Sequence, residues 1–328
     1  MTIKGILVTL LAPMENHIAN GGEKLLGNAS SIKRRPDGKV YISGQMQRHV
    51  LFSAIDRLNQ DDENKGQTFV SNGDGISNRI ETDLRADMGG FMHPSTGDYS
   101  GRRTAPLSVT PAVAIDESEV GRDLLLRIKT NVKGKHAYSN GYIISDKGED
   151  NDEKKQALAT KEYSQKDIMQ MNFFLDLNTL GISKVFNYKD TFHIGTSYIK
   201  HIKDEERKRR ARLYIEATRT MNDYANQARN AISGEPQQVL IVFDTKMSRK
   251  AARYFIGNDN EKANILSELK ERNATYFIGD DIGESNENIS NVNDAYKKAF
   301  DYLQTNDLYN PAGDDNSVKT FAAAFGED

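Results

Sequence analysis

The stretch KVYISGQMQRHVLFSAI, residues 39–55, is the part of the chain that most strongly indicates a local fold. Its first residues are β-branched or aromatic and follow the turn-forming residues 36–38, which predicts a short strand ending at Ile42. Ser43 comes next and is suited to cap a helix, because its hydroxyl can accept a hydrogen bond from an unpaired amide of the first turn. The sequence therefore predicts a strand followed by a helix from Ser43 to about Asn59.

This predicted helix has two chemically different faces at about 100° per residue. The polar face carries Gln45, Arg48 and His49, and the apolar face carries Val50, Leu51, Ala54, Ile55 and Leu58. A helix N-terminus that presents free N–H groups, a hydroxyl and an arginine is suited to bind phosphate. An ordinary capped helix with a solvated polar face would show the same pattern, so the residues alone leave both interpretations open.

Three blocks of the chain resemble one protein family in the same order. Residues 39–55 resemble the serine–glutamine–arginine helix of the CRISPR-associated RAMP proteins that form the Cascade backbone, the Cas-seven family in its DevR branch, as in type I-A and I-B systems. Upstream, NHIANGGEKLLGNASSIKRRPDG (16–38) is similar to the family's basic Asn/Gly-rich loop. Downstream, ETDLRADMGGFM (81–92) and RRTAPLSVTPAVAI (102–115) resemble its acidic–glycine–methionine block and returning strand. The resemblance covers most of the first 245 residues, and ISGQ-x-x-R and APLSVTPAVAI are its specific parts.

The remaining patterns predict a core with the order strand, helix, strand, strand, helix, strand. Besides the first helix, the predicted core elements are strands at 6–11, 107–115, 171–177 and 239–243 and a long helix at 204–232. This order is the RRM-like or ferredoxin-like β-α-β-β-α-β arrangement of an α+β fold, and the resemblance implies the same palm. Beyond Asp244 the sequence predicts a helix at 260–272, a strand at TYFIGDD and a helix at 292–303.

The predicted palm is interrupted by two long insertions. It comprises residues 1–59, 104–116 and 171–245, and residues 246–328 are a C-terminal extension expected to pack on it. Residues 60–103 are polar and rich in Gly, Asn and Asp, which predicts a loop-rich, finger-like insertion. Residues 117–170 include the charged stretch KGEDNDEKK and are predicted to form an extended β-hairpin, which the resemblance identifies as a thumb.

Composition limits the classes of function. The 328 residues include no cysteine, which excludes disulfides and thiolate metal sites and suits a reducing cytoplasm. Lys4 interrupts the apolar start, and GILVTLLAP is too short to span a bilayer, so we expect a cytoplasmic protein with no membrane partner. The net charge of −3 argues against indiscriminate nucleic-acid binding. Any such binding must therefore use a local basic surface.

The candidate RNA-binding residues are basic, amide, hydroxyl and glycine positions in or near the resembling blocks. Lys33, Arg34 and Arg35 precede the capped helix, and Arg102 and Arg103 precede the returning strand. The complete set is Asn20, Gly22, Lys33, Arg34, Arg35, Ser43, Gln45, Gln47, Arg48, Arg102, Arg103 and Arg209. Arg209 represents the densest basic cluster, residues 207–212, although charge runs are commonly solvated helix faces.

Signatures of catalysis are scarce. The chain has no P-loop, no dinucleotide fingerprint after a strand and no H-E-x-x-H motif, and its six histidines are scattered. Related RAMP backbone proteins of type III complexes cleave RNA with an aspartate in the loop before the strand that leads into helix one. An approximate register places Asn28 there, and an amide cannot supply the charge of a carboxylate. We therefore expect no catalytic residue, no metal and no cofactor.

The resemblance implies a backbone subunit of a type I Cascade complex, with many copies assembled along one CRISPR RNA. The expected partners are CRISPR RNA, further copies of the chain, Cas-five-like, Cas-six-like and Cas-eight-like subunits, and target DNA paired to the guide. Two alternatives remain. One is a metal-dependent RNA endonuclease subunit of a type III-like complex, and the other is a general RRM-like RNA-binding module.

Overall fold

The computed structural model describes residues 2–20, 29–71, 77–93, 101–128, 137–139, 142–144, 156–228, 230–283, 289–313 and 317–325. Within these ranges the chain is a mixed α+β protein, with helices on both faces of one large sheet. This confirms the predicted α+β class. No helix in the described ranges is long and apolar enough to cross a membrane.

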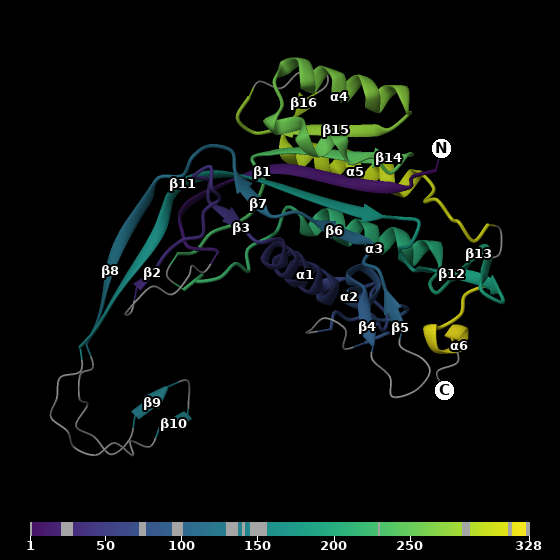
Figure 1. The fold of residues 1–328 in the computed structure, drawn as a ribbon, viewed down its shortest axis with the longest axis horizontal. Coiled ribbons are helices and arrows are strands. Elements are labelled where there is room, and N and C mark those ends of the chain that lie inside the picture. The colour runs from purple at the N-terminus through teal and green to yellow at the C-terminus, as the bar shows by residue number, and fades with distance from the viewer. Residues whose placement is uncertain are drawn as a thin grey trace.

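The centre of the sheet is a long, buried strand near the N-terminus. The core strands are β1 (Gly5–His17), β3 (Tyr41–Ile42), β6 (Leu107–Val109), β7 (Ala112–Ala114), β11 (Gln156–Asp176) and β14 (Gln238–Asp244). β1 is antiparallel to both of its neighbours, so that Val8 lies opposite Phe173 of β11 and Ile241 of β14. β6 and β7 pair with the other side of β11. The central order is therefore β14–β1–β11–β6/β7, which Figure 1 shows.

Both faces of β1 are buried, because successive side chains point to opposite faces of a sheet. Ile6, Val8 and Leu10 share a core with residues of α1 (Gly44–Asp61), α3 (Asp204–Ala217) and α5 (Val292–Thr305). Leu7 belongs to a second core with residues of η1 (Lys250–Ile256), α4 (Asp259–Glu271) and β15 (Thr275–Asp280). The continuous apolar run at 6–11 thus reflects burial on two sides, as predicted.

The second core helix is much shorter than predicted. α3 ends at Ala217 instead of Ile232. After it, the Thr218 hydroxyl donates to the Ile215 carbonyl at 2.6 Å and contacts the Tyr296 hydroxyl at 2.8 Å. Asn226 has a positive φ of 66°, which is incompatible with a continuing helix. Beyond Ala217, the apolar residues Met221, Tyr224 and Ile232 keep a helical spacing. They belong to an irregular segment whose side chains pack into the core.

The first insertion contains more regular structure than the loops predicted for it, and the second contains paired strands, as an extended β-hairpin does. In the first lie α2 (Leu84–Gly89), β4 (Phe91–His93) and β5 (Gly101–Arg103). In the second, β8 (Val120–Ile128) pairs with the first half of β11, so one strand of 21 residues runs from the ribbon into the central sheet. This ribbon extends away from the body in Figure 1, where β2 (Ala29–Ser30) pairs with it. β9 (Ala137–Ser139) and β10 (Tyr142–Ile144) form a separate pair, and the charged stretch at 147–155 lies outside the described residues.

One hairpin was not predicted from the sequence. β12 (Ile182–Lys189) and β13 (Phe192–Lys200) form a two-stranded sheet of their own between β11 and α3. Near the C-terminus, β16 (Ile289–Ser290) pairs with β15, and α6 (Phe321–Phe325) packs Phe321 against Phe91. The predicted helices at 260–272 and 292–303 are confirmed as α4 and α5, and the predicted TYFIGDD strand as β15.

Candidate nucleic-acid interface

The N-terminus of α1 is capped as predicted. Ser43 has an extended backbone, and its exposed hydroxyl accepts a hydrogen bond from the Met46 amide at 3.2 Å. No acidic residue lies in the first turn of α1, and Gln45 is exposed there. The positive end of the helix is therefore open to an anion, without a local carboxylate competing for it.

The basic residues before α1 lie on a tight, ordered turn. The Gly38 amide donates to the Arg35 carbonyl at 3.0 Å and the Arg35 amide to the Lys39 carbonyl at 2.9 Å. Gly38 has a φ of +78°, in the left-handed region, and an added Cβ would lie 2.8 Å from the Glu117 side chain. This turn, which we call the basic loop (residues 31–40), leaves Lys33, Arg34 and Arg35 exposed.

Asn20 connects the basic loop to the start of α1. Its side-chain amide donates to the Lys33 carbonyl at 2.8 Å and to the Tyr41 carbonyl at 2.9 Å. Tyr41 is two residues before the helix cap, so Asn20 fixes the basic loop next to Ser43. Arg35 also makes an ion pair with Asp37 at 3.5 Å, with both side chains about half exposed. Exposed pairs of this kind restrain a side chain only weakly.

Arg48 points toward the first insertion. Its Nη2 donates to the Gly89 carbonyl of α2 at 2.6 Å, and its guanidinium lies 5.7 Å from the centre of the Phe52 ring. An added Cβ at Gly89 would meet the same nitrogen at 2.6 Å, so the glycine permits this close approach. Arg48 is half-buried and therefore joins α1 to α2 while adding positive charge beside the helix.

Gln47 does not face solvent, which disagrees with its assignment as an RNA contact. Its side chain is completely buried, and its carbonyl accepts a hydrogen bond from the Tyr224 hydroxyl at 3.3 Å. Burial raises the pKa of Tyr224 far above its ordinary value, so this hydroxyl remains a donor. Gln47 precedes the core residues Val50 and Leu51 by three and four positions, and this helical spacing could have placed it in the core.

Arg103 is also a core residue and is not available to RNA in this structure. Its Nη2 contacts Asp87 at 2.6 Å, and its Nη1 donates to the Ile182 carbonyl at 3.1 Å. Burial lowers the pKa of the Arg103 guanidinium, although the charge of Asp87 opposes that shift. The other oxygen of Asp87 contacts Arg210 at 2.7 Å. One buried carboxylate thus pairs with two buried guanidinium groups.

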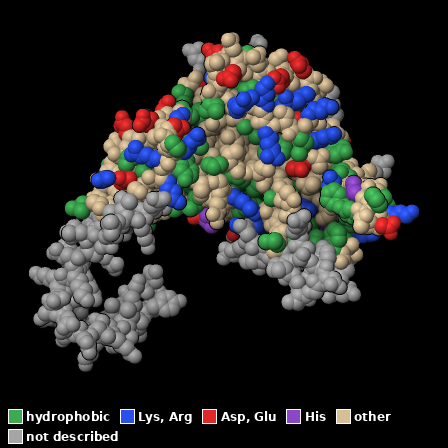
Figure 2. Space-filling model, viewed as in Figure 1, with side chains coloured by type: hydrophobic (Ala, Val, Ile, Leu, Met, Phe, Trp, Pro, Cys, Tyr) green, Lys and Arg blue, Asp and Glu red, His purple; other side chains and the backbone are tan. Residues whose placement is uncertain are grey.

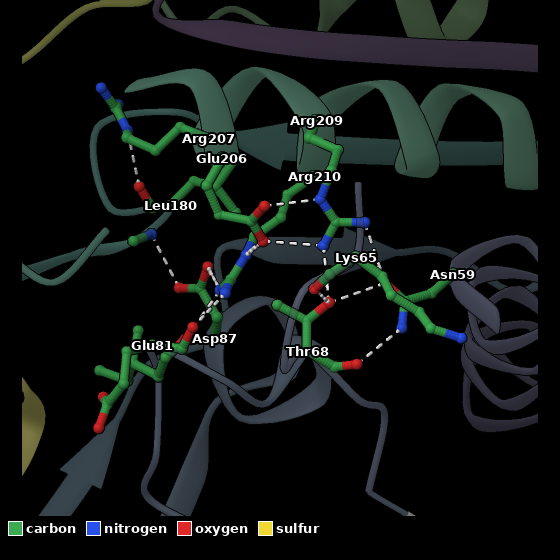
Figure 3. A network of polar contacts seen from close by, with 12 residues as sticks. Asn59, Lys65, Thr68, Glu81, Asp87, Leu180, Glu206, Arg207, Arg209 and Arg210 are labelled. Carbon is green, nitrogen blue, oxygen red and sulfur yellow. Dashed lines mark hydrogen bonds and ion pairs between the residues drawn. The ribbon is translucent and has the colours of Figure 1, made fainter. Parts of the chain in front are cut away.

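The dense basic cluster on α3, which includes Arg209, is occupied by internal contacts. Arg209 binds Glu206 and Asp62 with distances of 2.6 and 2.9 Å, and its side chain is 10% exposed. Desolvation alone would lower its pKa, but the hydrogen bonds that Arg209 donates to both carboxylates outweigh burial and raise it. Figure 3 shows Arg207 directed at Leu180, and both Arg209 and Arg210 directed at Glu206. This set of contacts around Asp87 and Glu206 is called the arginine network below.

The remaining predicted residues have no described side chain. Arg102 lies in β5 opposite Met92, while Gly22 and Asn28 fall outside the described residues. Across the described part of the chain, no group of three or more His, Asp or Glu side chains is placed to hold a metal ion. The structure thus brings together Asn20, Lys33, Arg34, Arg35, Ser43 and Gln45, and it separates Gln47, Arg103 and Arg209 from them.

Comparisons with known proteins agree with the sequence resemblance. The sequence model of the family described as "CRISPR-associated negative auto-regulator DevR/Csa2" matches residues 17–232. A chain of a solved "CRISPR RNA-guided surveillance complex" is 12% identical with a TM-score of 0.53, covering 91% of this chain and 99% of that one. A chain of a "CRISPR RNA-guided surveillance complex, pre-nicking" is 10% identical with a TM-score of 0.54 and the same coverages. At these identities the two structures support the fold alone, and a search of curated proteins gave no match.

Proposed function

Because the chain belongs to the DevR/Csa2 family of CRISPR-associated proteins, we propose that it is a guide-RNA-binding backbone subunit of a type I CRISPR surveillance complex. Copies of the chain would assemble along one CRISPR RNA and leave its bases open to pair with target DNA. The other proposed partners are Cas-five-like, Cas-six-like and Cas-eight-like subunits, and the proposed location is the cytoplasm.

We assign the central sheet and its two helices to an RRM-like palm. The order β14–β1–β11–β6/β7, with α1 after the first strand and α3 after the third, supports a β-α-β-β-α-β topology. Residues 60–103 would be the finger and 117–170 the thumb, with 246–328 as the extension. The β8–β11 ribbon supports the thumb assignment because it projects from the palm as a continuation of a core strand.

The observation that carries the proposal is the position of the basic loop beside the open N-terminus of α1. Lys33, Arg34 and Arg35 are exposed there, and Asn20 holds the loop against the residues that precede Ser43. Lysine and arginine side chains together with helix N–H groups bind phosphates without reading bases. Such a site suits a subunit that must hold any guide sequence. The proposed contact set is Lys33, Arg34, Arg35, Ser43 and Gln45, positioned by Asn20 and supported by the charge of Arg48.

A general RRM-like module is less well supported, because such modules bind RNA on the open face of the sheet. Here that face of β1, β11 and β14 carries the second core, where Leu7 and Leu240 share a cluster with Leu269 of α4. Gln170, on the same face, donates to the Ala252 carbonyl of η1 at 2.7 Å. The C-terminal extension therefore occupies the surface that a general module would use.

Neutralising two exposed charges of the basic loop tests the proposal. Lys33→Ala combined with Arg34→Ala should weaken binding of unrelated guide RNAs to a similar extent, because phosphate contacts carry no sequence information. The slope of log affinity against log salt should become shallower by up to about 0.7 per lost contact. The measurement is a salt titration of fluorescence anisotropy with two guides of unrelated sequence.

The matched control is Lys270→Ala combined with Lys298→Ala, which removes the same charge from exposed lysines outside the basic loop. We expect the control to bind as the unaltered protein does. A correctly folded basic-loop variant with unchanged affinity and salt slope would remove these residues from the guide site.

A further inference from the structure

The β12–β13 hairpin carries an unusual concentration of exposed apolar side chains. Phe186 is 52% exposed, Tyr188 62%, Phe192 73% and Ile194 64%. These four are among ten large apolar residues found exposed in the described part of the chain. Figure 2 shows apolar side chains at the end of the molecule where Figure 1 labels β12 and β13. Contiguous apolar surface of this kind commonly marks a binding site.

Two exposed aromatic rings of the hairpin, Phe186 and Tyr188, share one face with His193 and a cation. Lys184, Phe186 and Tyr188 alternate along β12, and residues two apart in a strand share a face. His193 lies opposite Tyr188, and its ring centre is 5.5 Å from that of Phe186 and 5.7 Å from that of Tyr188. The Lys184 ammonium lies 4.9 Å from the centre of the Phe186 ring. The face therefore presents a row of flat rings next to positive charge.

The charge of the hairpin indicates which class of ligand its exposed rings bind. Residues 182–200 contain three lysines and a single acid, Asp190. Lys200 is buried and paired with Asp204 at 2.6 Å, whereas Lys184 and Lys189 are exposed. The cores of protein–protein interfaces are depleted in lysine. Single-stranded nucleic acid is bound by aromatic rings that stack on bases and by cations that meet phosphates. The combination of rings and lysines thus favours nucleic acid over a protein partner.

We propose that the exposed face of the β12–β13 hairpin binds single-stranded nucleic acid. Phe186 and Tyr188 stack on bases, Lys184 on the same face meets a flanking phosphate, and Lys189, exposed beside the turn, adds positive charge. Figure 1 places this hairpin at the opposite end of the long axis from the β8–β11 ribbon and β2. It is separate from the basic loop, and it requires no contact made by Ser43 or Arg34. Stacking is sequence-tolerant, because every base has a flat face.

Photo-crosslinking locates the bound strand. The full chain is incubated with a single-stranded oligonucleotide of about 12 nucleotides that carries 5-iodouridine, a length within the range that single-strand sites cover. Mass spectrometry should find crosslinks within residues 182–200. These crosslinks should persist in the Lys33→Ala, Arg34→Ala variant, so that failure of the guide site and failure of the hairpin site give different results. Crosslinks confined to the basic loop and α1 would overturn the proposal.

Two double substitutions separate stacking from apolar docking. Phe186→Leu with Tyr188→Leu keeps apolar surface but removes the flat rings, whereas Phe186→Ser with Tyr188→Ser removes both. Stacking predicts that both variants lose about tenfold or more in affinity for the single strand. Phe69→Leu, at an exposed aromatic outside the hairpin, is the control and should bind normally.

The alternative outcome is a protein interface. If the leucine variant bound the oligonucleotide normally while the serine variant lost self-association by light scattering, the hairpin would be a docking surface between copies and the proposal would be wrong. Lys184→Gln with Lys189→Gln provides a second test that leaves every ring in place. It should make the salt dependence of oligonucleotide binding shallower, and an unchanged slope would also contradict the proposal.

Discussion

The basic loop and helix α3 are similarly rich in positive charge, but the structure uses them in opposite ways. Three consecutive basic residues of the loop, Lys33 to Arg35, are exposed. On α3, Arg207 and Arg210 are completely buried, and the side chain of Arg209 is 10% exposed. The density of basic residues in a sequence therefore does not distinguish a ligand-binding surface from an internal network.

The difference arises from the partners that the fold brings to each segment. In the loop the acid paired with a basic side chain, Asp37, lies beside Arg35 at the surface. On α3 the guanidinium groups meet Glu206 of the same helix, Asp87 of the first insertion and backbone carbonyls such as Leu180. Arginine suits these sites because its planar fork can satisfy several acceptors at once. The arginine network thereby fastens the first insertion and the β12–β13 segment to α3.

Of the changes that test this comparison, removing Asp87 should have the largest effect on the free energy of unfolding. Asp87→Ala leaves Arg103 and Arg210 buried without their shared carboxylate, and breaking a buried pair costs roughly 3–5 kcal/mol. We expect a large fall in the free energy of unfolding, measured by urea denaturation. Asp37→Ala, which breaks the exposed pair of the basic loop, should change it by about 1 kcal/mol or less. Similar losses in the two variants would contradict the distinction between the segments.

Removing Asn20 should affect the loop while leaving its charges in place. Asn20→Ala deletes the hydrogen bonds to the Lys33 and Tyr41 carbonyls, each with a net value of about 1 kcal/mol. We expect guide affinity to fall by about three- to tenfold, with a salt slope close to that of the unaltered protein, because no cation is lost. A shallower slope would mean that the loop no longer meets phosphate, and unchanged affinity would show that Asn20 does not position it.

Sequence reasoning succeeded where the pattern and the structure are local. The cap at Ser43, the helix that follows and the doubly buried strand at 6–11 all depend on neighbouring residues. It failed where interacting residues are distant in the sequence. Asp87, for example, lies 123 residues before its partner Arg210, so the burial of the arginines on α3 was not predicted. The same limit explains why the helix predicted at 204–232 was too long. The apolar residues keep a helical spacing beyond Ala217, but the helix ends there, and the Thr218 hydroxyl contacts the distant Tyr296 hydroxyl.

Two features that were not predicted, the burial of Gln47 and the β12–β13 hairpin, are indicated by patterns in the sequence. Gln47 shares the helical spacing of Val50 and Leu51, so its burial could have been predicted. The β12–β13 hairpin consists of two β-branched and aromatic runs around Asp190, which has a positive φ of 54° in the turn. Two such runs separated by turn-forming residues indicate a hairpin. The site residues themselves were assigned from the resemblance, and their contact with RNA stays a prediction.

Acid should weaken the contacts of α3 by a moderate amount. Desolvation alone would raise the pKa values of Asp62 and Asp204, but hydrogen bonds from Arg209 to Asp62 and from Lys200 and Arg207 to Asp204 hold both below the ordinary value of 3.8. A depressed pKa contributes stability above the unfolded value, and this stability is lost as pH falls through the folded one. We therefore expect the free energy of unfolding to decline below about pH 4.

The variant Asp62→Asn with Asp204→Asn tests this expectation. It should be less stable than the unaltered protein at neutral pH and should lose less stability between pH 5 and pH 3, a range of about two units that spans the titration. The Lys270→Ala, Lys298→Ala control should follow the unaltered protein. Parallel curves for the aspartate variant and the unaltered protein would assign the acid sensitivity to other carboxylates.

The smallest expected effect is that of divalent metal on bound RNA, because we expect no cleavage. A loop that only binds should not cut, so RNA incubated with the purified protein and Mg²⁺ or Mn²⁺ should remain intact by gel electrophoresis. The approximate register places Asn28, an amide, where type III-like relatives carry an aspartate, and an amide cannot supply the charge that metal or proton handling needs. Asp37 lies in the basic loop and pairs with Arg35. Metal-dependent cleavage that disappears in Asp37→Ala would therefore make the basic loop part of a catalytic site, and it would favour the endonuclease alternative over the guide-binding subunit.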